Sequence, residues 1–238
     1  VSLSVTPVGE LWKPALATLA LGAATPLWCI AILERLGRFS RVDAAAIAAH
    51  YGSVSAVTFL AASTYLDAAQ VGYEGFMPAL VALLEVPAIV VALLLARRGV
   101  ASSGSAREAL REVLTGKSIV LLVGGTLIGL VSGKSGVAPV APLFEGLFRG
   151  ALVLFLLEMG LVTGRRLGDL KRVGAFLIAF GIVMPVVHAT LGICVARLAG
   201  MSEGGAALLG VLASSASYIA PPPAVGTALA GANPTISL

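Results

Sequence analysis

The chain has 238 residues, of which 58% are apolar and only 12% are charged, and its mean hydropathy is +0.99. A soluble domain carries roughly 25% charged residues to cover its surface, so this composition excludes an ordinary soluble protein and indicates an all-α integral membrane protein. The formal net charge of +4 arises from basic residues that gather between apolar segments. We therefore interpret it as a membrane-topology signal and expect no nucleic-acid partner.

Apolar stretches long enough to span a membrane follow one another along the chain. A helix needs about 20 mostly apolar residues to cross the hydrocarbon core of a bilayer. We predict seven such segments, at residues 14–33, 44–65, 74–96, 118–133, 140–163, 172–198 and 205–230. The stretch 97–117 is rich in Ser and Arg and is the linker-like region that divides the chain into 1–96 and 118–238.

Basic residues are distributed unevenly between the two sides of the predicted membrane. If the helices alternate in direction, the loops 34–43 and 163–172 and the linker 97–117 fall on one side and hold twelve Lys and Arg residues. The other side receives three. By the positive-inside rule, we expect the linker to lie in the cytoplasm. We expect the protein itself to lie in the bacterial inner membrane.

Two of the apolar segments, the second and the last, are interrupted by the same polar motif. One contains Ser53-x-Ser55 and the other contains Ser215-x-Ser217, with three prolines that begin at Pro221. In the predicted topology these two segments cross the membrane in opposite directions. Interrupted helices at matching positions in two halves of a chain are typical of the binding site of a secondary transporter, so we expect the breaks to meet and form one site.

The matched breaks predict that 1–96 and 118–238 are inverted repeats. Two segments precede the long span 172–198, whereas nothing equivalent precedes residue 14, and the segment 74–96 has no counterpart after Leu238. We therefore expect a piece of a five-plus-five architecture, with about seven helices present, two missing at the start and one at the end. A genuine seven-helix protein is the alternative.

A break in a membrane helix exposes backbone groups that need polar partners. The N-terminus of a half-helix suits a small anion, and serine hydroxyls bind either an oxyanion or sodium. We predict that the substrate is bound by Gly52, Ser53, Ser55, Ser214, Ser215 and Ser217. We predict that sodium is bound by Ser53, Thr58, Glu85, Ser217 and Asn233. The structural alternative is that these serines bond back to the carbonyls of their own helices.

The remaining titratable residues of the spans allow further interpretations. Glu85 lies beside a proline within a span and suggests ion handling, with a paired structural carboxylate as the alternative. His188 is best explained as a packed, hydrogen-bonded neutral side chain, and His50 as a local hydrogen-bond partner or a cavity-lining group. An intramembrane hydrolase that used a serine with His50 or His188 is a rival function, but the chain contains no Gly-x-Ser-x-Gly motif. We expect no enzyme activity and no cofactor besides the sodium ion.

Several motifs together resemble the sodium-dependent bicarbonate transporters first known from cyanobacteria and their wider bacterial superfamily. They lie in the same order along nearly the whole chain: Gly52-Ser53-Val54-Ser55-Ala56 with Thr58, Tyr73-Glu74, Glu85-x-Pro87-Ala88, Pro142-Leu143-Phe144, Leu147-Phe148-Arg149-Gly150, Met159-Gly160, Pro185-Val186-Val187-His188, Ala213-Ser214-Ser215-Ala216-Ser217, Pro221-Pro222 and Ala232-Asn233-Pro234. Cyanobacterial members carry an aspartate before the prolines of the second break, where the stretch 216–220 contains no acid.

The resemblance implies ten helices in two inverted repeats and a sodium-coupled anion symporter of the inner membrane, with bicarbonate bound between the breaks. It also implies a homotrimer and, in cyanobacterial members, inhibition by a PII-like protein on the cytoplasmic side. From residues and resemblance together we expect sodium-driven symport of bicarbonate. Transport of a different small anion or carboxylate, and a membrane scaffold without transport, are the alternatives.

Overall fold

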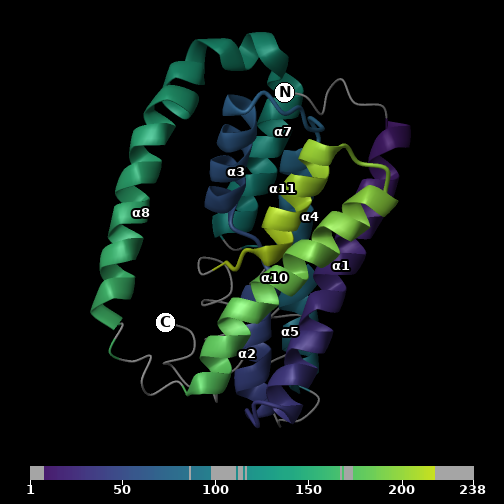
Figure 1. The fold of residues 1–238 in the computed structure, drawn as a ribbon. Coiled ribbons are helices and arrows are strands. Elements are labelled where there is room, and N and C mark those ends of the chain that lie inside the picture. The colour runs from purple at the N-terminus through teal and green to yellow at the C-terminus, as the bar shows by residue number, and fades with distance from the viewer. Residues whose placement is uncertain are drawn as a thin grey trace.

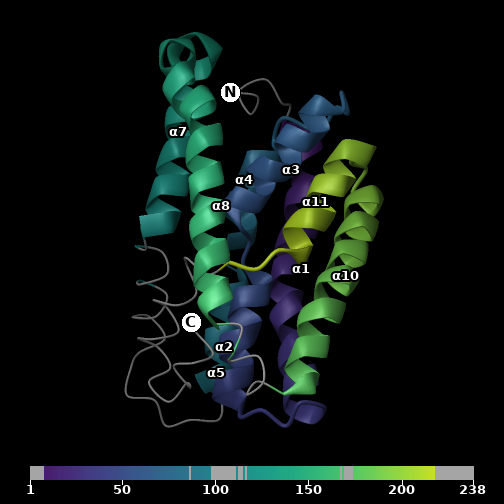
Figure 2. The same ribbon diagram turned by 60° about the vertical axis from the view of Figure 1, so that its left-hand side comes forward.

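The fold is a bundle of helices. The computed structural model describes residues 8–85, 87–97, 111, 115, 117–166, 168 and 174–217. Every regular element in this part of the chain is helical (Figures 1 and 2). In chain order the elements are α1 (Val8–Arg35), α2 (Arg41–Gly52), α3 (Ala56–Ala68), α4 (Met77–Glu85), α5 (Pro87–Arg97), α7 (Lys117–Val137), the 3-10 turn η2 (Ala138–Val140), the π-helical turn η3 (Pro142–Gly146), α8 (Leu147–Arg166), α10 (Ala175–Leu198) and α11 (Glu203–Ser214).

Four helical stretches among the described residues are long and apolar enough to cross a membrane. They are Gly9–Arg35, Arg41–Ala68, Met77–Ala96 and Ala175–Leu198. These stretches confirm the predicted all-α membrane fold, and the protein is a multi-pass membrane protein. Most of the linker 97–117, and the part of the segment 205–230 that follows Ser217, lie outside the described residues.

Two predicted segments differ from the observed helices for reasons that involve proline. The segment 74–96 is described as α4 and α5, on either side of residue 86, and α5 begins at Pro87, which has no N–H to donate to the α4 ladder. The segment 140–163 begins its α-helix only at Leu147. Residues before it form η2 and η3, each of which has a proline in its first turn, at Pro139 and Pro142.

Two apolar clusters lie on either side of the first break. The first cluster joins α1, α2 and α5, and the alanine-rich stretch Ala44–Ala49 of α2 is buried along its whole length. Such small side chains let membrane helices approach closely, where lipid supplies no hydrophobic drive for association. The second cluster joins α3, α4 and α11 through leucines that include Leu80, Leu84 and Leu209. The break between α2 and α3 therefore lies where one cluster gives way to the other.

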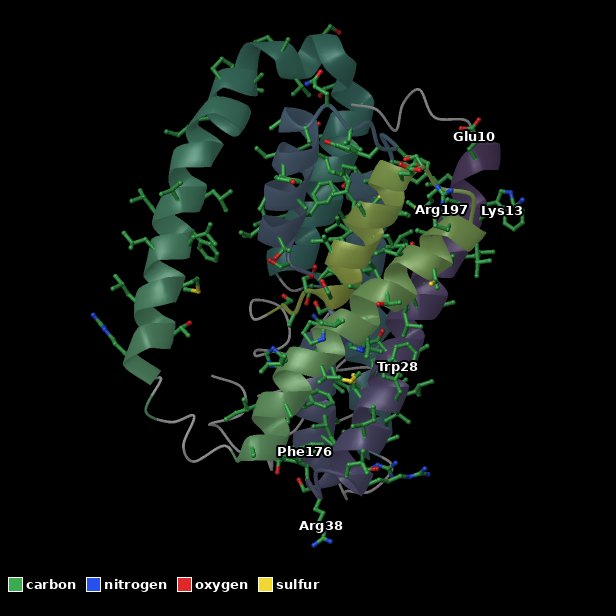
Figure 3. The ribbon with its side chains drawn as sticks, viewed as in Figure 1. Glu10, Lys13, Trp28, Arg38, Phe176 and Arg197 are labelled. Carbon is green, nitrogen blue, oxygen red and sulfur yellow. The ribbon has the colours of Figure 1, made fainter. Side chains whose placement is uncertain are left out.

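The two broken segments run in opposite directions. In Figure 1, α2 and α3 rise through the bundle, whereas α11 descends beside them. Figure 3 shows Arg38 at one end of the bundle and both Lys13 and Arg197 at the other. This arrangement places the two broken segments as an inverted repeat would require, although the repeat boundaries 1–96 and 118–238 stay a prediction.

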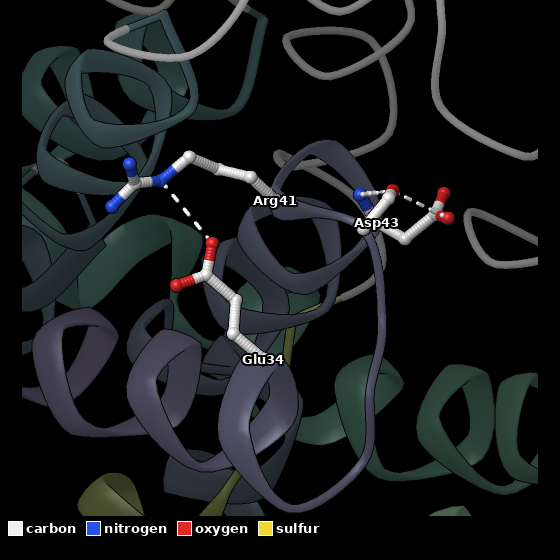
Figure 4. A network of polar contacts seen from close by, with 4 residues as sticks. Glu34, Arg41 and Asp43 are labelled. Carbon is white, nitrogen blue, oxygen red and sulfur yellow. Dashed lines mark hydrogen bonds and ion pairs between the residues drawn. The ribbon is translucent and has the colours of Figure 1, made fainter.

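The basic turn between α1 and α2 is fixed by short-range polar contacts (Figure 4). Ser40 caps α2, because its hydroxyl accepts a hydrogen bond from the Asp43 N–H at 3.1 Å and donates to the Asp43 carboxylate at 2.8 Å. The Arg41 side chain pairs with Glu34 of α1 at 3.2 Å. The beginning of α2, and with it the register of the first broken segment, is thus tied to the end of α1.

Helices α7 and α8 form an arm joined by η2 and η3. Helix α7 packs against α4, whereas α8 stands apart from the bundle in Figure 1. Large apolar side chains on both helices are exposed, among them Leu121, Val131 and Leu154. Apolar side chains of this kind are compatible with a lipid environment.

Candidate functional site

The first break is a short extended stretch between two helices. Helix α2 ends at Gly52, and Ser53 takes extended angles of φ −93° and ψ 148°. Ser55 is also extended, at φ −97° and ψ 115°, and its hydroxyl accepts a hydrogen bond from the Thr58 N–H at 3.2 Å. A serine in this conformation is a favoured N-cap, so Ser55 both ends the break and begins α3.

The second break begins where serine hydroxyls bond back to the helix that precedes them. Ser214 donates to the Val211 carbonyl at 2.9 Å, and Ser215 donates to the Leu212 carbonyl at 2.8 Å. Such bonds occupy helix carbonyls and favour termination. After α11 ends at Ser214, Ser215 is extended at φ −77° and ψ 155°. The back-bonding expected as the structural alternative is therefore present in α11, at the position where the helix stops.

Hydrogen bonds join the two breaks directly. The Ser55 N–H donates to the Ser215 hydroxyl at 3.2 Å, and the Ser217 N–H donates to the His50 carbonyl at 3.1 Å. The Ser217 carbonyl accepts a third bond from His50 Nδ1 at 2.7 Å. Residues 160 or more positions apart in the sequence thus form one polar cluster, and the structure brings Ser53, Ser55, Ser215 and Ser217 to one place.

Three helix ends meet at this cluster and give it both signs of partial charge. The N-terminus of α3 carries a partial positive charge, and its first N–H groups, at Ala56 and Val57, have no partner within the helix. The C-termini of α2 and α11 carry a partial negative charge, and the carbonyls of His50, Val211 and Leu212 in their last turns already accept hydrogen bonds. An anion is favoured at the α3 end and a cation at the α2 and α11 ends of the same cluster. We call this cluster, formed by His50, Ser53, Ser55, Ser215 and Ser217, the crossing.

Two polar atoms at the crossing are buried and have no hydrogen-bond partner among the residues that the structure describes. They are the Ser53 hydroxyl, whose residue is 0% exposed, and His50 Nε2. Buried polar groups are almost always paired. Each of these atoms therefore has the capacity to bind a ligand that enters the crossing.

Gly52 and Glu85 lie beside the break rather than within the hydrogen-bonded cluster. A side chain added at Gly52 would collide with Ala88 of α5 and come within 3.3 Å of Pro26 of α1, so glycine permits the close packing of three helices here. Glu85 is buried, at 5% exposure, at the end of α4 and three residues before Ala88. Because Ala88 packs on Gly52, Glu85 lies within one helical turn of a residue that contacts the first break.

The other predicted site residues fall into different settings. Thr58 lies in the first turn of α3, where its N–H bonds to Ser55, and the Ser214 hydroxyl bonds to its own helix. Asn233 lies outside the described residues. The assignment of all these side chains to substrate or sodium stays a prediction.

The bond from His50 to Ser217 is the site contact that sequence reasoning missed. His50 was expected to act as a local hydrogen-bond partner or to line a cavity, and instead its ring bonds across to the other break. The available signal was its position three residues before Ser53. Nothing in the sequence indicated that its partner would be a backbone carbonyl so far along the chain.

A second missed contact fixes the start of α11. The Glu74 carboxylate accepts a hydrogen bond from the N–H of Ser202, where a negative charge also complements the helix dipole. Side chains added at Gly204 or Gly205 would overlap Gly72 or the Glu74 carboxylate. The Gly-Gly pair after the helix cap is the sequence signal, because it allows the loop before α4 to lie on the end of α11.

His188 matches its sequence interpretation as a packed and hydrogen-bonded residue. It is 1% exposed, and its Nε2 accepts a hydrogen bond from the Trp28 indole at 2.8 Å. The edge of the Tyr51 ring faces it, with centroids 6.1 Å apart. This contact links α10 to α1 and supports the helices around the crossing without entering it.

Comparison with protein families gives a match over the whole chain. The profile described as the Na⁺-dependent bicarbonate transporter superfamily matches residues 1–238. A comparison with curated proteins finds none that matches the chain.

Proposed function

The chain belongs to the Na⁺-dependent bicarbonate transporter superfamily, and on that premise we propose that it carries a small anion, bicarbonate first, together with sodium across the bacterial inner membrane. The observation that carries the proposal is the crossing of the two breaks, where the Ser55 N–H bonds to the Ser215 hydroxyl. Irregular backbone inside a membrane protein is tolerated where it lines a site or a cavity. At this crossing the Ser53 hydroxyl and His50 Nε2 are buried without a hydrogen-bond partner among the described residues and are available to a ligand.

The anion is bound at the beginning of α3. The N–H groups of Ala56 and Val57 point out of the helix end, and the Ser53 hydroxyl, three residues before Ala56, is buried without a partner among the described residues. A helix N-terminus is a ready anion site, because its donors and its dipole act together. These groups would replace the water that solvates a small oxyanion.

Sodium is bound at the ends of α2 and α11. Carbonyl and hydroxyl oxygens are the ligands that hard cations prefer, and both helices end in carbonyls at the crossing. The predicted hydroxyl ligands Ser53 and Ser217 lie there, and the predicted ligand Glu85 is buried three residues before Ala88, which packs on Gly52. Binding anion and cation side by side makes each one favour the other, and this mutual dependence is the basis of symport.

Alternating access follows from movement of the helices that contain the breaks against the rest of the protein. Helices α2, α3, α10 and α11 pack around the crossing, whereas the α7–α8 arm contacts the bundle through α4 (Figure 2). We propose that the crossing moves as one unit relative to this arm, with the basic loops on the cytoplasmic side.

Uptake of labelled bicarbonate into proteoliposomes tests the proposal. An inward sodium gradient should drive uptake, and the double variant S53A/S215A should lose most of it. S63A is the matched control, because the Ser63 hydroxyl is also buried in the bundle but bonds to the Leu60 carbonyl of its own helix. Uptake that is indifferent to sodium, or that survives in S53A/S215A, would reject the mechanism. Sodium-driven uptake of another anion in place of bicarbonate would support the alternative substrate.

A further inference from the structure

One nitrogen of the His50 ring makes a hydrogen bond within the protein, and the other has no hydrogen-bond partner among the described residues. Its Nδ1 lies 2.7 Å from the Ser217 carbonyl oxygen, and because a carbonyl only accepts, Nδ1 carries the hydrogen of this bond. An isolated charge in the bundle would be costly, so the ring is neutral and Nε2 holds a lone pair. That atom is buried and has no hydrogen-bond partner among the described residues.

The crossing thus offers an acceptor and a hydroxyl from neighbouring positions of the chain. His50 lies in the last turn of α2, three residues before Ser53, which is the C-cap residue of that helix. The Ser53 hydroxyl, which also lacks a partner in the described part of the chain, can donate to a negatively charged oxygen. His50 Nε2 can only accept, so its ligand must bring a hydrogen.

Sodium does not satisfy the His50 nitrogen, because hard cations take oxygen ligands. Among small inorganic anions, chloride and nitrate carry no hydrogen, whereas a protonated oxyanion such as bicarbonate has one O–H. We infer that His50 is the specificity-determining residue of the proposed site: its Nε2 accepts the O–H of a protonated oxyanion while Ser53 donates to the unprotonated oxygen of the same anion. This inference rests on the proposed function.

The cost of the wrong anion follows from the same geometry. Nitrate is planar and close to bicarbonate in size, so size alone does not separate the two anions, but nitrate leaves Nε2 buried without a partner. Leaving a buried acceptor unsatisfied weakens binding roughly ten-fold or more. Discrimination between bicarbonate and nitrate should therefore depend on His50 rather than on the size of the site.

The variant H50N separates the role of His50 in anion selectivity from its structural role in bonding to Ser217. The Asn amide N–H can donate to the Ser217 carbonyl in the place of Nδ1, whereas nothing in Asn reaches the position of Nε2. With the protein in proteoliposomes at fixed pH and sodium gradient, we would measure the KM for labelled bicarbonate and the inhibition constant of nitrate. In the wild type, the nitrate constant should exceed the bicarbonate KM at least ten-fold. In H50N the bicarbonate KM should rise, because its O–H loses its acceptor, and the nitrate constant should not rise, because no Nε2 is left without a partner. The ratio of the nitrate constant to the bicarbonate KM should therefore fall about ten-fold, with the sodium dependence unchanged.

The control is H188N at the second of the two histidines of the chain, which should leave the ratio of the two constants as in the wild type. Nitrate that competes in the wild type as well as bicarbonate binds, or an unchanged ratio in H50N, would overturn the inference and leave the proposed function standing. Absence of sodium-driven bicarbonate uptake in the wild type would instead overturn the proposed function. If H50N does not fold, nitrate competition in the wild type decides.

Discussion

Replacing Gly52 with alanine should displace the end of α2, and with it the crossing, because Gly52 packs against α1 and α5. A methyl group at this position would overlap the side chain of Ala88 and lie 3.3 Å and 3.4 Å from Cγ and Cδ of Pro26. Neither neighbour is the end of a flexible side chain, because one is a Cβ atom on α5 and the other is a ring fixed to α1. The helices themselves must therefore move apart, and overpacking of this kind costs about 1–3 kcal/mol.

Thermal unfolding in detergent and sodium-driven uptake in proteoliposomes would be measured together for G52A. We expect a lower Tm and slower uptake, because the end of α2 carries His50 and leads directly into Ser53. G160A in α8 is the matched control, since an added methyl meets nothing within 4 Å there and alanine favours a helix by roughly 0.5–1 kcal/mol over glycine. If G52A unfolded at the wild-type temperature and transported at the wild-type rate, the packing argument would be wrong.

Two further variants test contacts that hold the bundle around the crossing. W28F removes the indole donor to His188 and should lower the free energy of unfolding, measured with denaturant, by about 1–3 kcal/mol. W12F, at a position that is 53% exposed, should lower it far less. Equal stabilities of the two variants would contradict the role of the Trp28–His188 bond. G205A should lower the free energy of unfolding, because its methyl group overlaps the Glu74 carboxylate. The double variant E74A/G205A should recover part of this loss. If the losses of the two single variants simply add in the double variant, the two residues are not coupled.

The positions of the breaks could be predicted from the sequence because polar residues inside apolar spans are rare and informative. Ser55 caps α3 and Ser215 ends α11, as hydroxyls at helix ends do. The opposite direction of the two segments followed from the distribution of Arg and Lys. These features depend on local chemistry and on the membrane, and both can be inferred from the order of residues along the chain.

Contacts between distant elements could not be predicted in the same way. The His50–Ser217 bond joins a side chain to a backbone carbonyl 167 residues away, and a carbonyl has no sequence signature. The packing of Gly52 on Ala88 depends on how closely α2 approaches α5, which is set by the buried alanines between them. The late start of α8 at Leu147 results from Pro139 and Pro142, whose effect on a helical turn depends on the register that the chain adopts.

Equilibrium binding of ²²Na⁺ to the purified protein, with and without bicarbonate, tests most directly whether the crossing binds both ions. If anion and cation occupy adjacent helix ends, bicarbonate should tighten sodium binding by about 5- to 150-fold. This effect should disappear in S53A/S215A and remain in S63A. Sodium binding that bicarbonate does not alter in the wild type, or an effect that persists in S53A/S215A, would contradict the assignment of the two breaks to one shared site.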